Sequence, residues 1–123
     1  MKKVVLVVDD EPMIVSIIEE LLRLSGLDAF SAADADEAEQ AIKRHRPDLI
    51  LLDVMMPRIT GFVFCQKLKS MPEYRDIPVI FLTVMNKPED IEKGKQLGAV
   101  DYIPKPFDPK DLIERIKRQL PDN

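Results

Sequence analysis

Residues 4–10 read VVLVVDD, a run of five apolar residues that ends in two adjacent aspartates. A continuous apolar run of this length predicts a strand that is buried on both faces, as in a parallel sheet. Carboxylates at the end of such a strand repel each other and are partly desolvated, which is costly unless positive charge offsets them. Asp9 and Asp10 therefore require a compensating cation from elsewhere in the fold.

Strand-like and helix-like segments alternate along the rest of the chain. Apolar runs predict strands at 4–8, 28–32, 49–52, 77–82 and 100–103. Helical periodicity, capping residues and first-turn prolines predict helices at 12–25, 34–44, 61–71, 88–97 and 108–120. The helix at 88–97 is expected to be weak, because its apolar residues are mainly Ile91 and Leu97 and its interior contains Gly94.

This alternation predicts an α/β fold with a five-stranded parallel sheet and helices on both faces. The weak segment 28–32 suits an edge strand, which gives the strand order 2-1-3-4-5 with strands 4–8 and 49–52 adjacent. A length of 123 residues is that of one domain, so residues 1–123 are expected to form a single unit.

Composition narrows the classes of function. The net charge of −4 argues against a general nucleic-acid or anionic-membrane surface. The single cysteine, Cys65, excludes an internal disulfide and favours a reducing, cytoplasmic location. The apolar stretch at 4–8 is too short for the core of a signal peptide, and no segment is expected to span a membrane.

Polar residues follow four of the five predicted strands. They are Asp9, Asp10, Asp53, Thr83 and Lys105. In an open α/β sheet, ligands bind outside the carboxyl ends of the strands, where the winding direction reverses. Three carboxylates that converge there favour a hard divalent cation with oxygen ligands, for which Mg²⁺ is the obvious candidate. Mg²⁺ and Lys105 would together supply the charge that Asp9 and Asp10 require.

Each of these residues also has an ordinary structural interpretation. Asp10 could cap the following helix, and Asp53 could be a turn residue. Thr83 could be a strand-end hydroxyl and Lys105 a solvated loop residue. Tyr102, within the strand predicted at 100–103, could be a packing residue with an exposed hydroxyl. The functional interpretation is preferred because four strand ends carry such residues at once.

Four segments, VVDDEP, LILLDVMMPRITG, VIFLTV and DYIPKPF, resemble the motifs of the response-regulator receiver domain of two-component signalling. The resemblance covers nearly the whole chain and implies the flavodoxin-like receiver fold. It implies a signalling switch, not an enzyme, that takes a phosphoryl group from a sensor histidine kinase or phosphotransfer protein. The resemblance also implies that the domain assists its own phosphorylation and dephosphorylation.

The same resemblance assigns roles to individual residues. Asp53 would accept the phosphoryl group, and Thr83 and Lys105 would contact its oxygens. Asp10 and Asp53 would bind Mg²⁺, or Mn²⁺ in its place, through their side chains. Asp9 would act mainly through a bound water.

Two further roles follow from the resemblance. Met55 would contribute its backbone carbonyl to the metal, and Tyr102 would change rotamer on activation together with a shift of Thr83. The output would be a change in binding of a downstream protein through the face formed by helix 88–97, strand 100–103 and helix 108–120. The absence of a following effector segment favours a stand-alone receiver.

Helix 12–25 carries a wider apolar sector than packing on a sheet requires. Met13, Ile17 and Leu24 lie along one edge of this sector, and the first two are near the Asp9–Asp10 corner. Receiver resemblance places kinase or phosphotransfer helices there, so Met13 and Ile17 are expected to dock the phosphoryl donor. For Leu24, a simple core boundary is an equal alternative.

Three alternatives compete with the receiver interpretation. An aspartate-nucleophile phosphatase would carry a second acid two residues after the nucleophile, where this sequence has Met55. A flavin-binding electron carrier would need a phosphate loop after the first strand, where the sequence has DDEP. A degenerate receiver that takes no phosphate is disfavoured because all five core positions are filled.

Overall fold

The computed structural model describes residues 2–121 and contains alternating strands and helices in the predicted order. The strands are β1 (Val4–Val8), β2 (Asp28–Ala32), β3 (Leu49–Leu52), β4 (Val79–Thr83) and β5 (Asp101–Pro104). The helices are α1 (Pro12–Leu24), α2 (Ala35–Arg44), α3 (Gly61–Lys69), α4 (Pro88–Gln96) and α5 (Pro109–Gln119).

All strand pairs are parallel, and their order is β2-β1-β3-β4-β5, which confirms the predicted topology. Val8 at the end of β1 pairs with Leu52 at the end of β3. Thr83 at the end of β4 pairs with Pro104. This register sets the residues that follow the strands side by side along one edge of the sheet.

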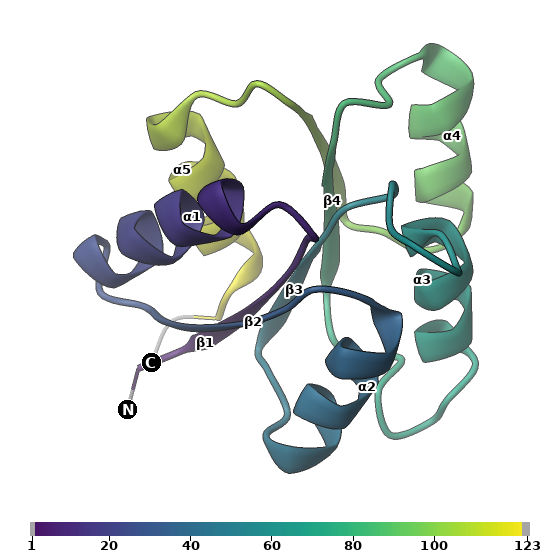
Figure 1. Ribbon diagram of the computed structural model, residues 1–123, viewed down its shortest axis with the longest axis horizontal. Coiled ribbons are helices and arrows are strands. Elements are labelled where there is room, and N and C mark those ends of the chain that lie inside the picture. Colours follow the sequence, from purple (N-terminus) through teal and green to yellow (C-terminus); the bar gives the residue numbers. More distant parts are fainter. Residues whose placement is uncertain (1, 122–123) are drawn as a thin grey trace.

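Helices cover both faces of the sheet, as predicted. Figure 1 shows α1 and α5 on one face and α2, α3 and α4 on the other. The two faces have separate cores, because successive strand residues point to opposite sides. Val5 and Val7 belong to the α1–α5 core, whereas Leu6 and Val8 belong to the core beneath α2, α3 and α4.

Two strands differ from their predicted ranges. The segment expected at 77–82 forms a strand at Val79–Thr83, because Pro78 has no N–H to donate and the ladder begins after it. The segment expected at 100–103 forms a strand at Asp101–Pro104 on the edge of the sheet, where a terminal proline is tolerated. Four of the five helices end one or two residues earlier than expected.

The start of α1 overturns the interpretation of Asp10 as a helix cap. Glu11 occupies the N-cap position, and no side chain caps the helix there. The Asp9 carboxylate instead accepts a hydrogen bond from the Glu11 amide at 3.0 Å. The Asp10 side chain is left exposed to solvent.

Among residues 2–121, no helix is long and apolar enough to cross a membrane.

Candidate functional site

Asp9, Asp10 and Asp53 converge at the carboxyl ends of β1 and β3. One carboxylate oxygen from each lies within 4.8 Å of the other two. Asp9 and Asp53 are each only 4% exposed, whereas Asp10 faces solvent. A cluster of carboxylate oxygens at this spacing matches the ligands that Mg²⁺ and other hard divalent cations prefer.

The side chain of Lys105 extends across the carboxyl ends of the strands to reach this cluster. Its Nζ donates to Asp9 at 2.7 Å and to Asp53 at 3.0 Å, and it lies 3.2 Å from the exposed carboxylate of Glu11. The Lys105 amide donates to the Thr83 carbonyl at 2.9 Å, which fixes the base of its side chain beside β4. The contact with Glu11 was not predicted, although Glu11 belongs to the quoted DDEP motif.

Burial and charge act against each other in this cluster. Burial raises the pKa of Asp9, and the hydrogen bond from Lys105 opposes that rise without cancelling it. Burial alone would lower the pKa of Lys105, but hydrogen bonds to Asp9 and Asp53 raise it above its usual value. Lys105 is therefore a permanent positive charge, and the carboxylates are only partly compensated by it.

The Asp53 carboxylate is held from two sides. One oxygen accepts from the Met55 amide at 3.1 Å, and the other accepts from Lys105. Gly61 allows the start of α3 to approach the backbone of Asp53, because a Cβ at that position would clash with the Asp53 carbonyl oxygen. We did not predict this role for Gly61, although it closes the quoted PRITG segment at the start of α3.

Thr83 and Tyr102 are joined through the backbone of Met85. The Thr83 hydroxyl oxygen accepts from the Met85 amide at 3.3 Å, and the Tyr102 hydroxyl donates to the Met85 carbonyl. Thr83 is fully buried, and Tyr102 is only 7% exposed. Burial, followed by the charges of Asp90 and Asp53, raises the pKa of Tyr102 to about 12.

A family model for the response regulator receiver domain matches residues 5–117. The chain belongs to the response regulator receiver domain family. Receiver domains of this family act in phosphorylation-activated two-component switching, bind Mg²⁺ at an acidic pocket and interact with histidine kinases or phosphotransfer proteins. Its homologues are regulators or receiver domains and not classical enzymes.

Individual relatives agree with this assignment. The receiver is 44% identical to the probable transcriptional regulator ycf27 of Porphyridium aerugineum, over 97% of the chain and 48% of that protein. It is 39% identical to the alkaline phosphatase synthesis transcriptional regulatory protein PhoP of Bacillus subtilis, over 98% of the chain and 49% of that protein. The chain thus spans about half the length of these curated relatives.

Solved structures show the same fold. The chemotaxis protein CheY4 of Vibrio cholerae superposes with a TM-score of 0.91 at 34% identity. That match covers 98% of this chain and 100% of CheY4. The flavodoxin-like receiver fold predicted from the sequence is therefore confirmed.

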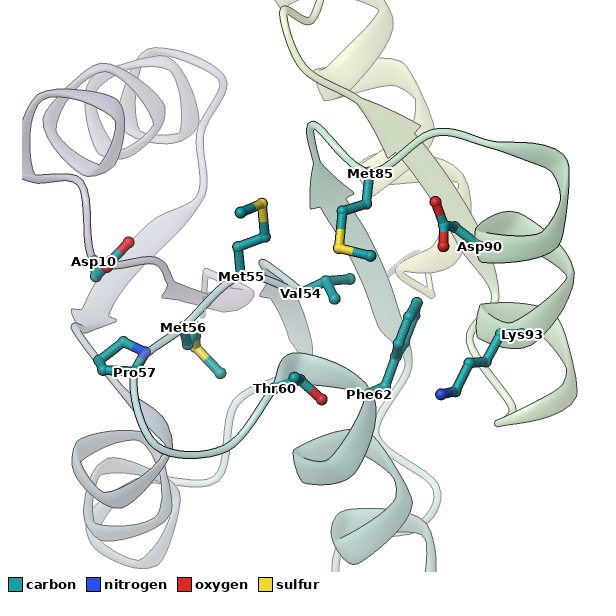
Figure 2. A pocket seen from close by; sticks show the side chains of 10 residues that line it. All are labelled: Asp10, Val54, Met55, Met56, Pro57, Thr60, Phe62, Met85, Asp90 and Lys93. Carbon is teal, nitrogen blue, oxygen red and sulfur yellow. The ribbon is translucent and has the colours of Figure 1, made fainter.

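A pocket of about 690 Å³ opens beside the acidic cluster of the receiver. Figure 2 shows Met55 and Met85 facing each other across it, with Phe62 below and Asp10 at one end. Met55 is 54% exposed, and the neighbouring Val84 is 56% exposed. Met55 and Met85 therefore give this pocket flexible apolar walls.

The predicted edge of α1 is exposed in the receiver. Met13 is 78% exposed, Ile17 48% and Leu24 76%. Ile14 and Val15, on the same helix, pack against the core instead. The excess of apolar surface predicted for this helix is thus present, and Met13 lies at the end nearest Asp10.

Proposed function

We propose that Asp53 accepts a phosphoryl group from a sensor histidine kinase or a phosphotransfer protein in a Mg²⁺-dependent reaction. The observation that carries this proposal is the convergence of Asp9, Asp10 and Asp53, two of which, Asp9 and Asp53, form ion pairs with the buried side chain of Lys105. A structural salt bridge would need one carboxylate for each lysine. Three carboxylates with one lysine leave an excess of negative charge, which suits a site that also binds a divalent cation.

The donor set fits Mg²⁺, with Mn²⁺ as a possible substitute. Asp10 and Asp53 would hold the ion through their carboxylates, Asp9 through a water, and Met55 through its backbone carbonyl. A bound divalent cation would supply charge neutralisation between the carboxylate of Asp53 and the incoming phosphoryl oxygens.

In the transfer step, an oxygen of Asp53 attacks the phosphorus of the donor. A new phosphorus–oxygen bond forms while the bond from phosphorus to the donor breaks, and the donor group leaves with that electron pair. The product is an acyl phosphate on Asp53. Lys105 already contacts an oxygen of Asp53 and would neutralise the phosphoryl charge, which is the main requirement of such a transfer.

Thr83 and Tyr102 would transmit the change. The Thr83 hydroxyl accepts from Met85 and keeps its own hydrogen available for a phosphoryl oxygen. A shift of Thr83 would pull on the backbone N–H of Met85. The backbone carbonyl of the same residue accepts a hydrogen bond from the Tyr102 hydroxyl. We propose that this movement alters the α4–β5–α5 face and, through it, the binding of a downstream protein.

The exposed edge of α1 would receive the phosphoryl donor. Met13 and Ile17 combine large apolar exposure with a position on the helix that begins two residues beyond Asp10. A histidine-bearing helix that packs here would present its phosphohistidine toward the acidic corner. Exposed apolar side chains in a row are typical of such interfaces.

An aspartate-nucleophile phosphatase is disfavoured by the position of Met55. It lies two residues after Asp53, is 54% exposed and offers no general acid. Three expectations from the sequence stay predictions. They are a cytoplasmic location, a stand-alone arrangement and the lack of direct contact with nucleic acid.

Intact-mass spectrometry tests the proposed reaction. After incubation with a small acyl phosphate, the protein should gain one phosphoryl group in the presence of Mg²⁺ and none in the presence of a chelator. Equal labelling in both conditions would contradict the metal dependence, and no labelling in either would contradict the reaction.

A further inference from the structure

Gly94 is the buried residue in the interior of α4. Glycine weakens a helix relative to alanine, so its presence here needs a reason. The surrounding positions of α4 carry exposed charged residues, and the helix is held to the core mainly by the partly buried Ile91 and Leu97. The reason therefore lies on the buried side of the helix.

The ring of Tyr102 occupies the space that a side chain at position 94 would need. A Cβ on Gly94 would lie 2.8 Å from Cδ2 and 3.1 Å from Cε2 of Tyr102. It would lie 3.2 Å from Cδ2 of Phe81. The first distance is shorter than real Cβ contacts, so the ring and an alanine cannot share this space without movement.

The ring of Phe81, which borders the same space, cannot easily give way. Phe81 is completely buried, with its ring centroid 5.7 Å from that of Tyr102. Phe62 packs edge-on against Phe81 at 5.1 Å between centroids. A close-packed aromatic cluster of this kind resists compression, so a Cβ at Gly94 would displace Tyr102 outward.

Displacement of Tyr102 would break a chain of contacts. Its hydroxyl could no longer donate to the Met85 carbonyl, and the Met85 amide is the group that donates to the Thr83 hydroxyl. Gly94 therefore lies at one end of a physical path that runs through Tyr102 and Met85 to the strand end beside Asp53.

We propose that Gly94 is a positioning residue that sets the inward position of Tyr102 and, through it, the position of the loop between β4 and α4. Its lack of a side chain is what allows α4 to approach the ring. The consequence for signalling rests on the proposed function: with a side chain at position 94, Thr83 would be uncoupled from α4.

The titration of Tyr102 reports its position directly. The sequence contains two tyrosines, so Tyr74→Phe leaves Tyr102 as the one chromophore. In that background, tyrosinate absorbance should rise with a midpoint of about 12, and Gly94→Ala should shift the midpoint toward 10. Lys95→Ala, an exposed neighbour on the same helix, should leave it unchanged. An unchanged midpoint in folded Gly94→Ala protein would overturn the proposal.

A double-mutant cycle covers the case in which Gly94→Ala alone fails to fold. With Tyr102 present, Gly94→Ala should raise the unfolding equilibrium constant. In a Tyr102→Ala background the same change should lower it by roughly two- to fivefold, because alanine is the better helix former. The same destabilisation in both backgrounds would overturn the proposal. Neither experiment uses phosphorylation, so a failure of Asp53 to accept phosphate would be recognised separately.

Discussion

Lys105 lies 2.7 Å from Asp9, and both side chains are almost completely buried. The two residues follow β5 and β1, which are separated in the sheet by β3 and β4. The Lys105 side chain therefore extends across the carboxyl ends of the central strands. Its positive charge offsets the repulsion between the carboxylates that these strands bring together.

Removal of this charge should destabilise the domain. Lys105→Met should lower the free energy of unfolding by about 3 kcal/mol in the presence of a chelator, because buried carboxylates would lose their partner. Mg²⁺ should restore part of the loss by binding the folded state. Urea denaturation measures both effects, with Lys110→Met, an exposed lysine on α5, as the control. Equal stability of Lys105→Met and the parent in chelator would contradict this account.

Docking of the phosphoryl donor on α1 can be separated from the chemistry at Asp53. Ile17→Glu should slow transfer from a protein donor by roughly tenfold, the effect of losing an apolar contact of about 1.4 kcal/mol. Labelling by a small acyl phosphate should be unaffected. Val63→Glu is a matched control, because Val63 is 49% exposed and Ile17 48%. Equal loss with both donors would show that the substitution had damaged the fold instead.

The lifetime of the acyl phosphate should be long for a receiver. Met55 and Met85 line the pocket beside the acidic cluster, and Val84, next to Thr83, is exposed. We expect these three side chains to shield Asp53 from attacking water, because none of them can orient a water molecule. Met55→Asn or Met85→Glu should shorten the lifetime by roughly tenfold, equivalent to about 1.4 kcal/mol of barrier. Val84→Ala should shorten it less. Decay of labelled protein, followed by intact mass, measures the effect, and unchanged lifetimes would reject shielding.

Stability at alkaline pH should depend on Tyr102. Because folding raises its pKa from 10.0 to about 12, the unfolded chain releases this proton first as pH rises. The stabilisation is complete below pH 10 and is lost as pH rises through about 12. The parent should therefore lose up to about 3 kcal/mol relative to Tyr102→Phe across this window. Parallel profiles for the two proteins in denaturant unfolding would exclude the effect.

Sequence patterns were sufficient for the topology and for the composition of the site. VVLVV and LILL read as buried strands, and the polar residues directly after them identified Asp9 and Asp53. In a parallel sheet the carboxyl ends of the strands lie on the same side, and this rule predicted that Thr83 and Lys105 lie near the two aspartates. These inferences needed only local patterns and one topological rule.

Contacts across the fold were beyond local patterns. Gly94 was interpreted as a weakness of α4, because helix propensity takes no account of the Tyr102 ring that the glycine admits. Gly61 was treated only as the start of a helix, and its approach to the Asp53 carbonyl depends on three-dimensional packing. Asp10 matched the pattern of a helix cap, yet the cap position falls on Glu11.

The central claim is that Asp53 is the phosphoryl acceptor, and site mapping tests it most directly. The protein is labelled with a small acyl phosphate and Mg²⁺, reduced with borohydride to trap the acyl phosphate, and digested for peptide mass spectrometry. The account predicts modification at Asp53 in the parent and in the control Asp28→Asn, an exposed aspartate on β2, and none in Asp53→Asn. Equal labelling of Asp53→Asn, or modification that maps to Asp9 or Asp10 in the parent, would contradict it.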